Sequence, residues 1–397
     1  MNSYFVDLHV HIGRTEKGAP VKISGSRDLT FYNIAKEASD RKGIEVIGII
    51  DCQSPGVQEE ITAYLDKGDM EEQKGGGIRY DRTIVMLGSE IEVKDEGMGP
   101  AHLLAYMPTL DSMRAFTEWM RPYMKNVQLS SQRLYVPARH LQDEVVGRGG
   151  FLIPAHIFTP YKSVYGSATT RLANMLDPDR LAAVELGLSA DTEMASCLSE
   201  LDRYSFVTNS DAHSLGKIGR EYNRIDMLEP SFEELRLALV REGGRQVSAN
   251  YGLNPRLGKY HRTYCGVCES VLDEREVASE RCLYCGSGKI VRGVMDRIQS
   301  IADRTEPNIA AHHPPYRFQV PLEFIPGLGK KKLARLLELF GTEMNILHRV
   351  GEDELRQAAG DEIAGYLMQA RAGTLALQVG GGGKYGKVSR GNDTFFS

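Results

Sequence analysis

Short apolar runs alternate with amphipathic stretches through the first 215 residues, and this alternation restricts the possible folds more than any other feature of the sequence. The runs have the length and composition of buried strands, whereas stretches such as 31–42 and 134–148 carry apolar residues at helical spacing. Repeated strand–helix units predict an α/β fold with a parallel sheet, which we expect to close as a barrel. The predicted strands are 5–12, 46–51, 83–93, 102–107, 151–156, 183–187 and 205–211, one fewer than in the common eightfold form.

Candidate metal ligands gather at the ends of these predicted strands. In an α/β barrel the strand ends on one face open into a shared crevice, so side chains far apart in the sequence meet there. Five of the ten histidines occupy such positions, and two of them, at 9 and 11, share one face of a strand. The candidates are His9, His11, Asp51, Glu90, His102, His156, Glu185, Asp211 and His213.

The alternative for any one of these histidines is a structural role, since a single histidine at a strand end is more often hydrogen-bonded than metal-bound. Several donors from separate segments favour a metal site instead, and we expect divalent ions there, Zn, Mn or Mg. Such a histidine-rich set favours Zn, Mn or Fe over Mg. Clustered cations activate water and neutralise phosphoryl charge, so the pattern predicts a metal-dependent phosphoesterase.

Five separated motifs resemble those of the PHP (polymerase and histidinol phosphatase) superfamily. They are Asp7-Leu8-His9-Val10-His11, Gly88-Ser89-Glu90, Ala101-His102-Leu103-Leu104, Pro154-Ala155-His156 and Ser210-Asp211-Ala212-His213. The resemblance covers roughly residues 1–220. It implies a distorted seven-stranded TIM-like barrel that binds two or three ions.

The same resemblance implies a role for each ligand. The catalytic set around one ion would be His9, His11, Glu90 and Asp211, and a second ion would be bridged by Glu90 and held by His102 and His156. The chain departs from the superfamily at Asp51-Cys52, where many members have Asp-His. The candidate ligands of a third ion are therefore His213 with Asp51 or Cys52.

Residues near these motifs are candidates for binding substrate. Lysine, arginine, serine and tyrosine can each hold a phosphate oxygen, although a solvated surface role is about as compatible with every one of them. If the substrate proves to be a nucleotide extruded from a duplex, aromatic residues Phe158, Tyr161 and Tyr165 are candidates for lining its pocket. The predicted substrate-binding residues of this region are Ser26, Lys162, Tyr165 and Arg220.

Two Cys-x-x-Cys pairs stand thirteen residues apart, at Cys265, Cys268, Cys282 and Cys285. Four thiolates at this spacing are typical of a closed tetrahedral zinc site, so we expect one structural Zn. Redox chemistry or an iron centre is the minor alternative. Zinc ribbons are frequent in nucleic-acid enzymes and also serve protein docking.

The run Phe324-Ile-Pro-Gly-Leu-Gly-Lys-Lys-Lys resembles a helix–hairpin–helix motif. A Gly-x-Gly turn exposes backbone N–H groups at a helix N-terminus, which suits a DNA phosphate, and lysines add sequence-independent attraction. The alternative is a plain pair of helices with a glycine turn. The predicted DNA contacts are Gly327, Gly329, Lys330 and Lys331, whereas a second, acidic copy at 359–363 is expected only to pack.

Charge and composition divide the chain into three parts. Residues 1–255, the expected catalytic barrel, carry 28 Lys and Arg against 36 Asp and Glu, whereas residues 256–340 carry 14 against 10. We expect a zinc-binding module at 256–295 and a helical DNA-binding region with a glycine-rich tail at 296–397. An acidic enzyme domain with a more basic segment behind it fits a catalytic domain with an appended binding module.

The order of barrel, four-cysteine module and helix–hairpin–helix region resembles the endonuclease Q family of DNA-repair enzymes. The resemblance implies cleavage of DNA on the 5′ side of deaminated bases (uracil, hypoxanthine, xanthine) and of abasic sites. Expected partners are lesion-bearing DNA and, beyond it, replication or repair proteins. The alternatives are a PHP-type exonuclease or small-molecule phosphoesterase with an appended DNA-binding module, and a DNA-binding scaffold with an inactive cluster.

The sequence also bears on the location of the protein. No run of about eighteen apolar residues predicts a membrane span. The first ten residues, MNSYFVDLHV, lack the basic and apolar regions of a secretory signal. We therefore expect a cytoplasmic, nucleoid-associated protein.

Overall fold

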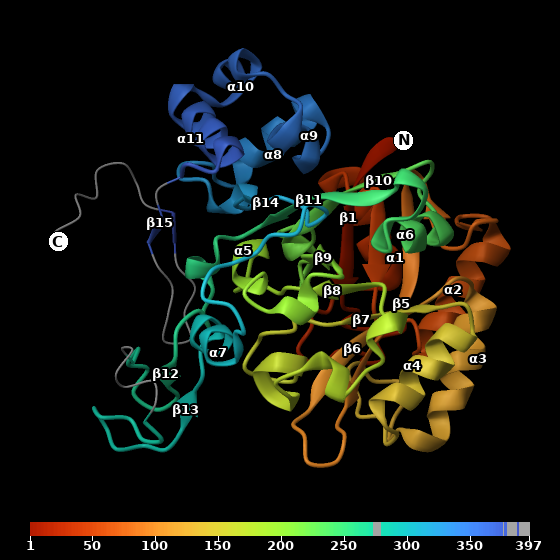
Figure 1. The fold of residues 1–397 in the computed structure, drawn as a ribbon. Coiled ribbons are helices and arrows are strands. Elements are labelled where there is room, and N and C mark those ends of the chain that lie inside the picture. Colours follow the sequence, from red (N-terminus) through yellow and green to blue (C-terminus); the bar gives the residue numbers. More distant parts are fainter. Residues whose placement is uncertain (273–278, 376, 379–386, 389–397) are drawn as a thin grey trace.

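The computed structural model of the chain describes residues 1–272, 279–375, 377–378 and 387–388. A mixed sheet lies at its centre, with helices on the outside of the sheet (Figure 1). Two smaller parts project from one side of the molecule, namely the cysteine segment and the last group of helices (Figure 1). The glycine-rich run 380–386, predicted as a loop, lies outside the described residues.

Ten strands form the central sheet within the described part of the chain. The strands of the structure are β1 (Asn2–Val10), β2 (Val46–Ile49), β3 (Glu71–Glu72), β4 (Ile78–Tyr80), β5 (Thr83–Val93), β6 (Ala101–Met107), β7 (Phe151–Pro154), β8 (Ala183–Glu185), β9 (Ser205–Val207), β10 (Tyr222–Met227), β11 (Gln246–Gly252), β12 (Tyr264–Cys265), β13 (Ile290–Val291), β14 (Tyr316–Phe318), β15 (Leu377–Gln378) and β16 (Lys387–Val388). The main ladder runs β14-β11-β10-β1-β2-β5-β4-β3, with β6 beside β5 and β7 beside β6. The pairs β8–β9, β12–β13 and β15–β16 are separate.

All seven strands predicted from the sequence are present, but the predicted parallel arrangement is wrong in part. Strands β1, β2 and β5 are parallel, whereas β6 is antiparallel to both β5 and β7. The connection between β5 and β6 contains only residues 94–100. A parallel crossover needs about a dozen residues or more, so this short connection reverses the chain direction.

A few backbone hydrogen bonds, outside any regular ladder, join the β8–β9 pair to the rest of the sheet. Ala182 N–H donates to the Leu152 carbonyl over 3.4 Å beside β7, and Ala212 N–H donates to the His9 carbonyl over 3.2 Å beside β1. The strands thus follow one another around a common interior. Among the described residues the regular ladders stop at these two junctions, so a closed seven-stranded barrel stays a prediction.

The helices begin where the sequence supplies a cap. Thr109 and Ser231 accept backbone N–H groups at the starts of two helices, and Pro55 occupies the first turn of another. The helices are α1 (Phe31–Lys36), α2 (Pro55–Lys67), α3 (Leu110–Met120), α4 (Ala138–Gly147), α5 (Thr192–Ala195), α6 (Phe232–Leu239), α7 (Val294–Ile301), α8 (Lys330–Phe340), α9 (Glu343–His348), α10 (Glu352–Ala359) and α11 (Asp361–Ala372). Helix α4 begins later than predicted, directly after Pro137, because proline disfavours helical geometry in the residue before it.

Two buried apolar clusters hold the sheet and helices together. One contains side chains from β1, β2, β5, β6, β7 and β9, such as Leu8, Met86 and Tyr106, and is covered by α6. The larger one lies between the sheet and the other helices. Gly48 lets β1 and β2 approach, because a Cβ there would lie 2.2 Å from the Leu8 carbonyl oxygen. The Tyr106 hydroxyl donates to the same carbonyl over 2.6 Å, so the interior stays close-packed without an unpaired hydroxyl.

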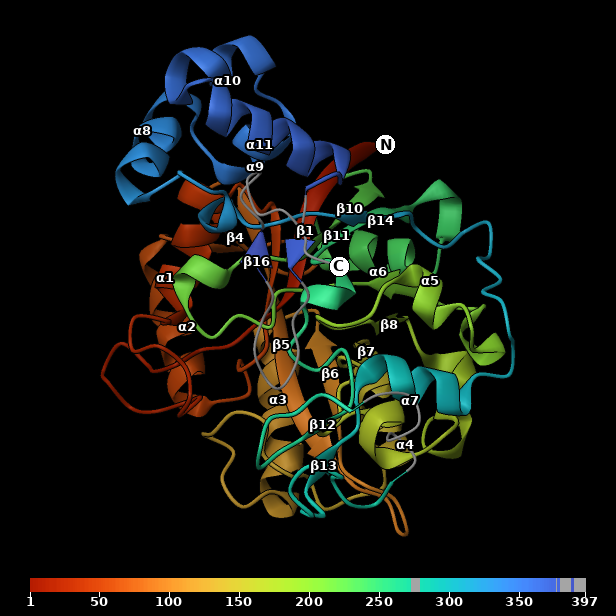
Figure 2. The same ribbon diagram turned by 90° about the vertical axis from the view of Figure 1, so that its left-hand side faces the viewer.

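The last helices, α8–α11, form a lobe at one end of the sheet (Figures 1 and 2). Helix α9 holds this lobe in place, since Lys42 Nζ lies 3.0 Å from Glu343 Oε2 and the two side chains are 4% and 8% exposed. His348 stacks on Phe5 with ring centroids 4.7 Å apart. Strand β14 precedes the lobe and pairs with β11, so the chain returns to the sheet after the cysteine segment.

A search of the helices for a membrane crossing gives a negative result. Among the described residues, no helix combines the length and apolar content that a crossing requires.

Candidate active site and metal centres

Predicted ligands from several strands meet around the carboxylate of Glu90, at one end of the central sheet. His9 lies near the end of β1 and His11 just beyond it, His102 lies in β6, and His156 follows β7. Glu90 Oε1 lies 3.5 Å from His9 Nε2, 2.8 Å from His102 Nδ1 and 3.4 Å from His156 Nε2. Glu90 Oε2 lies 3.6 Å from His11 Nε2. The strand ends therefore bring four histidines to one carboxylate.

Asp211 and His213, which follow β9, complete the cluster. Asp211 Oδ1 lies 3.6 Å from His9 Nε2, 3.5 Å from His11 Nε2 and 3.7 Å from His213 Nδ1. Three overlapping donor groups result, each with its ligand atoms within 4.8 Å of one another: His9–His11–Glu90, Glu90–His102–His156 and His11–Asp211–His213. This arrangement could hold two or three ions.

The spacing of the donor atoms suits coordination of metal ions better than hydrogen bonding among the donors themselves. Within the described residues, His9 Nε2 and His102 Nε2 are buried without a hydrogen-bond partner. A buried polar atom left unpaired is costly, which indicates that another group completes these sites. Donors bound to Zn at about 2.0–2.2 Å lie roughly 3–3.6 Å apart, and most contacts of Glu90 and Asp211 fall in that range. The protein therefore carries metal-binding groups whose chemistry suits imidazole- and carboxylate-bound ions.

Two further carboxylates contact the Nδ1 atoms of His9 and His11, the ring nitrogens that point away from Glu90. Glu185 Oε1 lies 3.0 Å from His9 Nδ1, while its other oxygen accepts the His156 N–H over 2.7 Å. Asp51 Oδ2 lies 3.0 Å from His11 Nδ1. Carboxylates in such positions fix the tautomer of a ligand histidine and raise its basicity. Asp51, expected as a ligand of a third ion, thus lies behind His11 rather than in any of the three groups.

Cys52, the other expected ligand of a third ion, does not belong to the third donor group either. The Cys52 thiol donates to the Ile49 carbonyl over 3.1 Å, and complete burial raises its pKa, so it remains a protonated core side chain. His213 groups with His11 and Asp211 instead. Burial and the neighbouring His11 charge lower the pKa of His213 to about 4, which leaves its imidazole neutral and able to bind a cation.

The electrostatics of the cluster favour charged groups despite their burial. Burial acts to raise the pKa of Glu90, but the charges of His102 and Lys22 outweigh it and hold that pKa well below its usual range. Burial likewise acts to lower the pKa of His9, but Glu185 and Asp211 raise it well above the usual value. The lowered pKa of Glu90 and the raised pKa of His9 favour an ionised carboxylate beside a protonated imidazole, and a divalent cation would displace that proton.

Backbone strain concentrates at this site. Of the seven described non-glycine residues with positive φ, four lie in or beside the pocket: Ser131 (53°), His156 (30°), Lys162 (52°) and Asp211 (45°). Such conformations cost free energy in residues that carry a Cβ, and they cluster at functional sites. Gly187 permits the turn at His156, because a Cβ at Gly187 would lie 2.8 Å from the His156 Cβ.

The cluster forms the floor of a pocket of about 390 Å³. Five cationic side chains line it, namely Lys22, Lys162, Lys217, Arg220 and Lys259, together with Tyr161 and Tyr260. Lys22 Nζ lies 3.3 Å from Glu90 Oε2 and donates to Ser131 Oγ over 2.5 Å. A ring of cations above bound metals would suit a polyanionic substrate.

The predicted substrate contacts divide into two groups. Lys162 and Arg220 line the pocket, where Lys162 Nζ lies 2.8 Å from Glu92 and Arg220 Nε donates to the Ser210 carbonyl over 2.7 Å. Ser26 does not line it, since its hydroxyl bonds to Asp28 and its N–H to the His213 carbonyl. Tyr165 is not brought to the pocket either.

Tyr165 and Phe158 lie in the apolar core instead. Their rings stack 5.3 Å apart, and the Tyr165 hydroxyl donates to Glu200 over 2.5 Å. The expectation that Tyr165 contacts substrate is therefore not supported by its position. Of the three aromatic candidates, Tyr161 alone lies at the pocket, and 52% of it is exposed.

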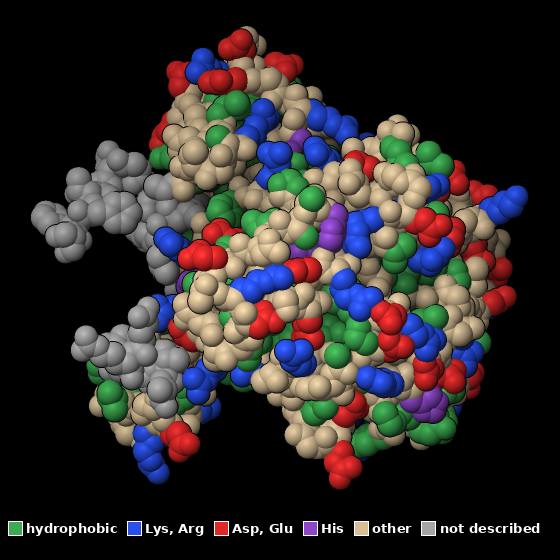
Figure 3. Space-filling view, viewed as in Figure 1, with side chains coloured by type: hydrophobic (Ala, Val, Ile, Leu, Met, Phe, Trp, Pro, Cys, Tyr) green, Lys and Arg blue, Asp and Glu red, His purple; other side chains and the backbone are tan. Residues whose placement is uncertain are grey.

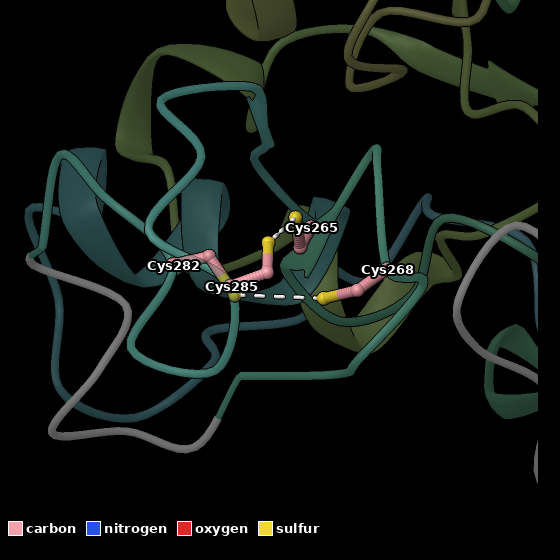
Figure 4. Close-up of side chains that lie close together, drawn as sticks. All are labelled: Cys265, Cys268, Cys282 and Cys285. Atoms are coloured by element: carbon pink, nitrogen blue, oxygen red, sulfur yellow. Dashed lines mark hydrogen bonds between the residues drawn. The ribbon is translucent and has the colours of Figure 1, made fainter.

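The four cysteines form the predicted cluster. Cys265 Sγ lies 3.6 Å from Cys285 Sγ, and Cys268 Sγ lies 3.6 Å from Cys282 Sγ, with all four sulfurs turned toward one centre (Figure 4). Four thiolates around Zn at about 2.3 Å lie roughly 3.8 Å apart, so the geometry fits one tetrahedral ion. Hydrogen bonds from Ser270 lower the pKa of Cys268 to about 6, which favours the thiolate.

The predicted helix–hairpin–helix turn opens helix α8. Gly327 has φ of 78°, which requires glycine, and Gly329 is the N-cap without a side-chain cap. Lys330 and Lys331 are exposed in the first turn, where the backbone N–H groups have no partner within the helix. Figure 3 shows Lys and Arg where this lobe meets the rest of the molecule and Asp and Glu at its outer end.

Sequence reasoning missed several pocket residues. Lys22 comes from an irregular loop, and Lys259 and Tyr260 precede the cysteine segment. None of them lies at a strand end or in a motif, so periodicity gives no signal for them. Adjacency of Lys259 and Tyr260 to the cysteine segment was the one available hint.

Comparisons with known proteins extend along nearly the whole chain. A scan against models of known protein families finds no match. The uncharacterised protein YqxK of Bacillus subtilis is 47% identical over 390 residues, which cover 98% of this chain and 100% of YqxK. The uncharacterised protein MJ0043 of Methanocaldococcus jannaschii is 36% identical over 252 residues, or 58% of this chain and 31% of that protein.

Two solved structures share the complete fold. The lesion-specific endonuclease PfuEndoQ from Pyrococcus furiosus superposes with a TM-score of 0.84 and 30% identity over 98% of this chain and 95% of that one. A complex of endonuclease Q with a 27-mer duplex that has an abasic lesion at the active site gives a TM-score of 0.85 and 29% identity, over 99% and 98% of the two chains. The shared α/β architecture therefore includes the cysteine segment and the last helices.

Proposed function

Because the chain belongs to the endonuclease Q family, we propose that it is a metal-dependent endonuclease that cleaves DNA at damaged nucleotides. Membership in this family makes it an enzyme, a hydrolase of phosphodiester bonds. One observation carries the proposal for this chain: the Glu90 carboxylate lies within 3.6 Å of four histidines, on the floor of a pocket lined by five cationic side chains. A complete ligand set argues against a scaffold with an inactive cluster.

Each donor group has a proposed ion. His9, His11, Glu90 and Asp211 would hold the first, Glu90 with His102 and His156 the second, and His11 with Asp211 and His213 a third. When bound, such ions activate a water molecule and neutralise the charge that develops on the phosphoryl oxygens. Zn or Mn suits the imidazole donors better than Mg does.

Protein side chains would position the substrate and its ligands. Glu185 and Asp51 hold the imidazoles of His9 and His11 in the tautomer that leaves Nε2 free for a cation. Lys22 and Arg220 line the pocket beside Glu90 and Asp211, where they would bind non-bridging oxygens of the scissile phosphate. Cleavage on the 5′ side of the lesion would leave a 3′-hydroxyl and a 5′-phosphate on the lesion nucleotide.

Abasic and deaminated nucleotides are the proposed lesions. The solved relative with an abasic lesion at its active site supports the first. Deamination replaces an amino group by a carbonyl, and the charged lysines and arginine of the pocket are donors that match a carbonyl better than an amine. The proposed substrates are therefore uracil, hypoxanthine and xanthine nucleotides as well as abasic sites. A damaged base is also easier to extrude from the duplex into a pocket.

The remaining parts would bind the DNA around the lesion. We assign residues 1–255 to catalysis, 256–295 to a zinc-stabilised module and 296–397 to a helical DNA-binding region. The turn at Gly327 and Gly329 with Lys330 and Lys331 offers backbone N–H groups and positive charge to a phosphate, as a helix–hairpin–helix does.

A nicking assay on defined duplexes tests the proposal. Duplexes with one uracil, hypoxanthine, xanthine or abasic site, or with no lesion, are incubated with the protein and Zn, Mn or Mg. We expect a single cut 5′ to each lesion and none in the undamaged strand. His9→Ala should remove the activity, whereas His140→Ala, an exposed histidine on α4, should not.

Three results would overturn the proposal. Digestion from the ends regardless of lesion would indicate an exonuclease, and hydrolysis of small phosphate esters without DNA cleavage would indicate a small-molecule phosphoesterase. Tight binding to lesion duplexes with no cleavage under any of the metals would indicate a scaffold.

A further inference from the structure

Asn209 lies between the strand that carries His9 and the carboxylate that contacts this histidine. It comes just after β9, and only 1% of it is exposed. Its Nδ2 donates to Glu185 Oε1 over 2.7 Å, and its Oδ1 accepts the Leu8 N–H over 2.9 Å. Leu8 directly precedes His9 in β1. A closed loop of hydrogen bonds therefore runs from the backbone of β1 through Asn209 and Glu185 to the His9 imidazole.

The backbone of β1 decides which way the Asn209 amide points. A backbone N–H can only donate, so the Asn209 atom that faces Leu8 is the oxygen, and the NH2 group faces Glu185. Glu185 Oε2 accepts the His156 N–H over 2.7 Å. These two donors fix the Glu185 carboxylate, which then faces His9 Nδ1 at 3.0 Å and favours a proton on that nitrogen. The opposite ring nitrogen, His9 Nε2, is left to a cation.

Two further buried asparagines, Asn223 in β10 and Asn250 in β11, continue from Asn209 into the central sheet. Asn223 Nδ2 donates to Asn209 Oδ1 over 3.1 Å, and Asn250 Nδ2 donates to Asn223 Oδ1 over 2.8 Å. Asn250 Nδ2 also donates to the Phe206 carbonyl of β9 over 3.0 Å. Because β9 pairs with β8 apart from the central sheet, these side chains hold it there in place of a ladder. Asn250 thus supports the fold two amides away from Glu185.

We propose that Asn209 is a positioning residue of the metal centre, which holds Glu185 and through it the His9 ring and the His156 backbone. This role rests on the proposed function, whose metal site it deepens. Asn209 lines the pocket, so a contact with substrate is the alternative. Both acceptor positions of its oxygen are taken, by the Leu8 N–H and Asn223 Nδ2, and its NH2 group donates to Glu185. The amide is therefore engaged by the protein, which favours positioning.

The first test measures metal affinity without DNA. Mn is the probe, because imidazole and carboxylate donors accept it whereas the four thiolates favour Zn, which stays in the cysteine segment. Asn209→Ala should weaken Mn binding about tenfold, measured by competition with a chelator, since loss of an outer partner of a ligand histidine has effects of this size.

Asn250→Ala is the matched control. It removes an equally buried amide of the same network, so it should lower the midpoint of thermal unfolding of the Mn-free protein as Asn209→Ala does. Its Mn affinity should change less than about twofold. Equal losses of Mn affinity in the two variants would show general destabilisation and would overturn the positioning role.

A double variant tests whether the effect passes through Glu185. In the background of Glu185→Gln, Asn209→Ala should weaken Mn binding by less than about twofold, because the carboxylate that it would hold is already absent. Additive losses would overturn the role. If Asn209→Ala does not fold, Asn209→Ser replaces it, since the shorter side chain keeps a hydroxyl for Leu8 and gives up the donor to Glu185.

The outcomes separate this role from the proposed function. Mn binding that Asn209→Ala weakens in a protein that cuts no lesion would support the role and refute only the endonuclease activity. Unchanged Mn affinity with weaker binding of a lesion duplex would make Asn209 a substrate contact, which overturns the positioning role while the endonuclease activity stands.

Discussion

The cluster around Glu90, which we propose to be catalytic, and the cysteine cluster both gather candidate metal ligands, but they are built in opposite ways. The catalytic ligands come from strand ends spread between residues 9 and 213, and His9, His11 and Glu90 are at most 2% exposed. The cysteines come from one short segment, 265–285, and two of them are exposed. The central sheet and its helices can thus hold their candidate ligands in place by packing, whereas we expect the cysteine segment to depend on a bound ion.

The side chains that surround the ligands differ between the two clusters in the same way. Glu185 and Asp51 hold the ring nitrogens of the catalytic histidines that face away from the pocket. The described part of the cysteine segment packs only a small apolar cluster, Cys265, Leu272 and Cys282, with Ile290 against it. Metal loss should therefore inactivate the first region without unfolding it and should unfold the second locally.

The largest expected effect tests the catalytic side of this contrast. Glu90→Ala removes the carboxylate shared by two donor groups, so the single-turnover rate should fall by a factor on the order of 10³ or more. Metal analysis should show loss of the barrel ions and retention of one zinc per chain. Glu96→Ala, an exposed acid in the β5–β6 connection, should change neither quantity. Loss of the zinc as well would contradict the independence of the two regions.

The next effect concerns the carboxylate behind His9. Glu185→Gln keeps the size of the side chain but removes the charge that orients the imidazole and raises its pKa. We expect metal affinity to fall about 10–100-fold, measured by competition with a chelator. An unchanged affinity would mean that packing alone, without the carboxylate charge, orients His9.

A smaller effect is expected at the cysteine cluster. Cys268→Ser removes one of four thiolates, so the segment 259–292 should lose its zinc and become sensitive to protease. DNA affinity should fall about tenfold, while the midpoint of thermal unfolding of the barrel and its metal content stay the same. Val267→Ser, a change at an exposed neighbour, is the control. A barrel that unfolds at lower temperature in Cys268→Ser would show that the two regions fold as one.

The smallest effect tests how the thermal stability of the first region depends on pH, independently of its metals. Burial raises the pKa of Glu221 to about 8, against hydrogen bonds from Thr208 and the Leu253 N–H that lower it. A carboxyl with a raised folded-state pKa stabilises the fold below its unfolded-state pKa, and that stability is lost as pH rises through about 8. Glu221→Gln cannot ionise, so relative to this variant the unmodified protein should lose about 5 °C of melting temperature between pH 5 and pH 8.5. A constant difference across that range would refute the raised pKa.

Much of the catalytic cluster was predictable because its ligands share one local signal. Each of His9, Glu90 and His156 lies in or directly after an apolar run, and strands of one sheet have their ends in common. The cysteine cluster was predictable from spacing alone, and the structure confirms it. The antiparallel direction of β6 was missed, although the short connection before it contained the information.

The rest depends on three-dimensional contacts that sequence neighbours do not encode. Tyr165 follows His156 closely, yet it packs on Phe158 in the core, because proximity along a loop does not tell which side a ring faces. Lys22 reaches Glu90 from a loop without periodicity. Asp51 follows an apolar run, as a metal ligand would. Its contact with His11 Nδ1 in the structure shows that it instead orients that imidazole.

Strand β14 has a consequence for the integrity of the chain. Strand β14 returns to the central sheet and pairs with β11. The cysteine segment is therefore an insertion between two strands of this sheet, and both of its ends are anchored there. Arg304 and Asp202 add an ion pair on the return path. A single peptide cut between residues 266 and 289 would therefore leave two fragments that stay assembled, with the last helices still on the barrel. The same topology makes this segment a place where one recognition module can be exchanged for another without rebuilding the enzyme.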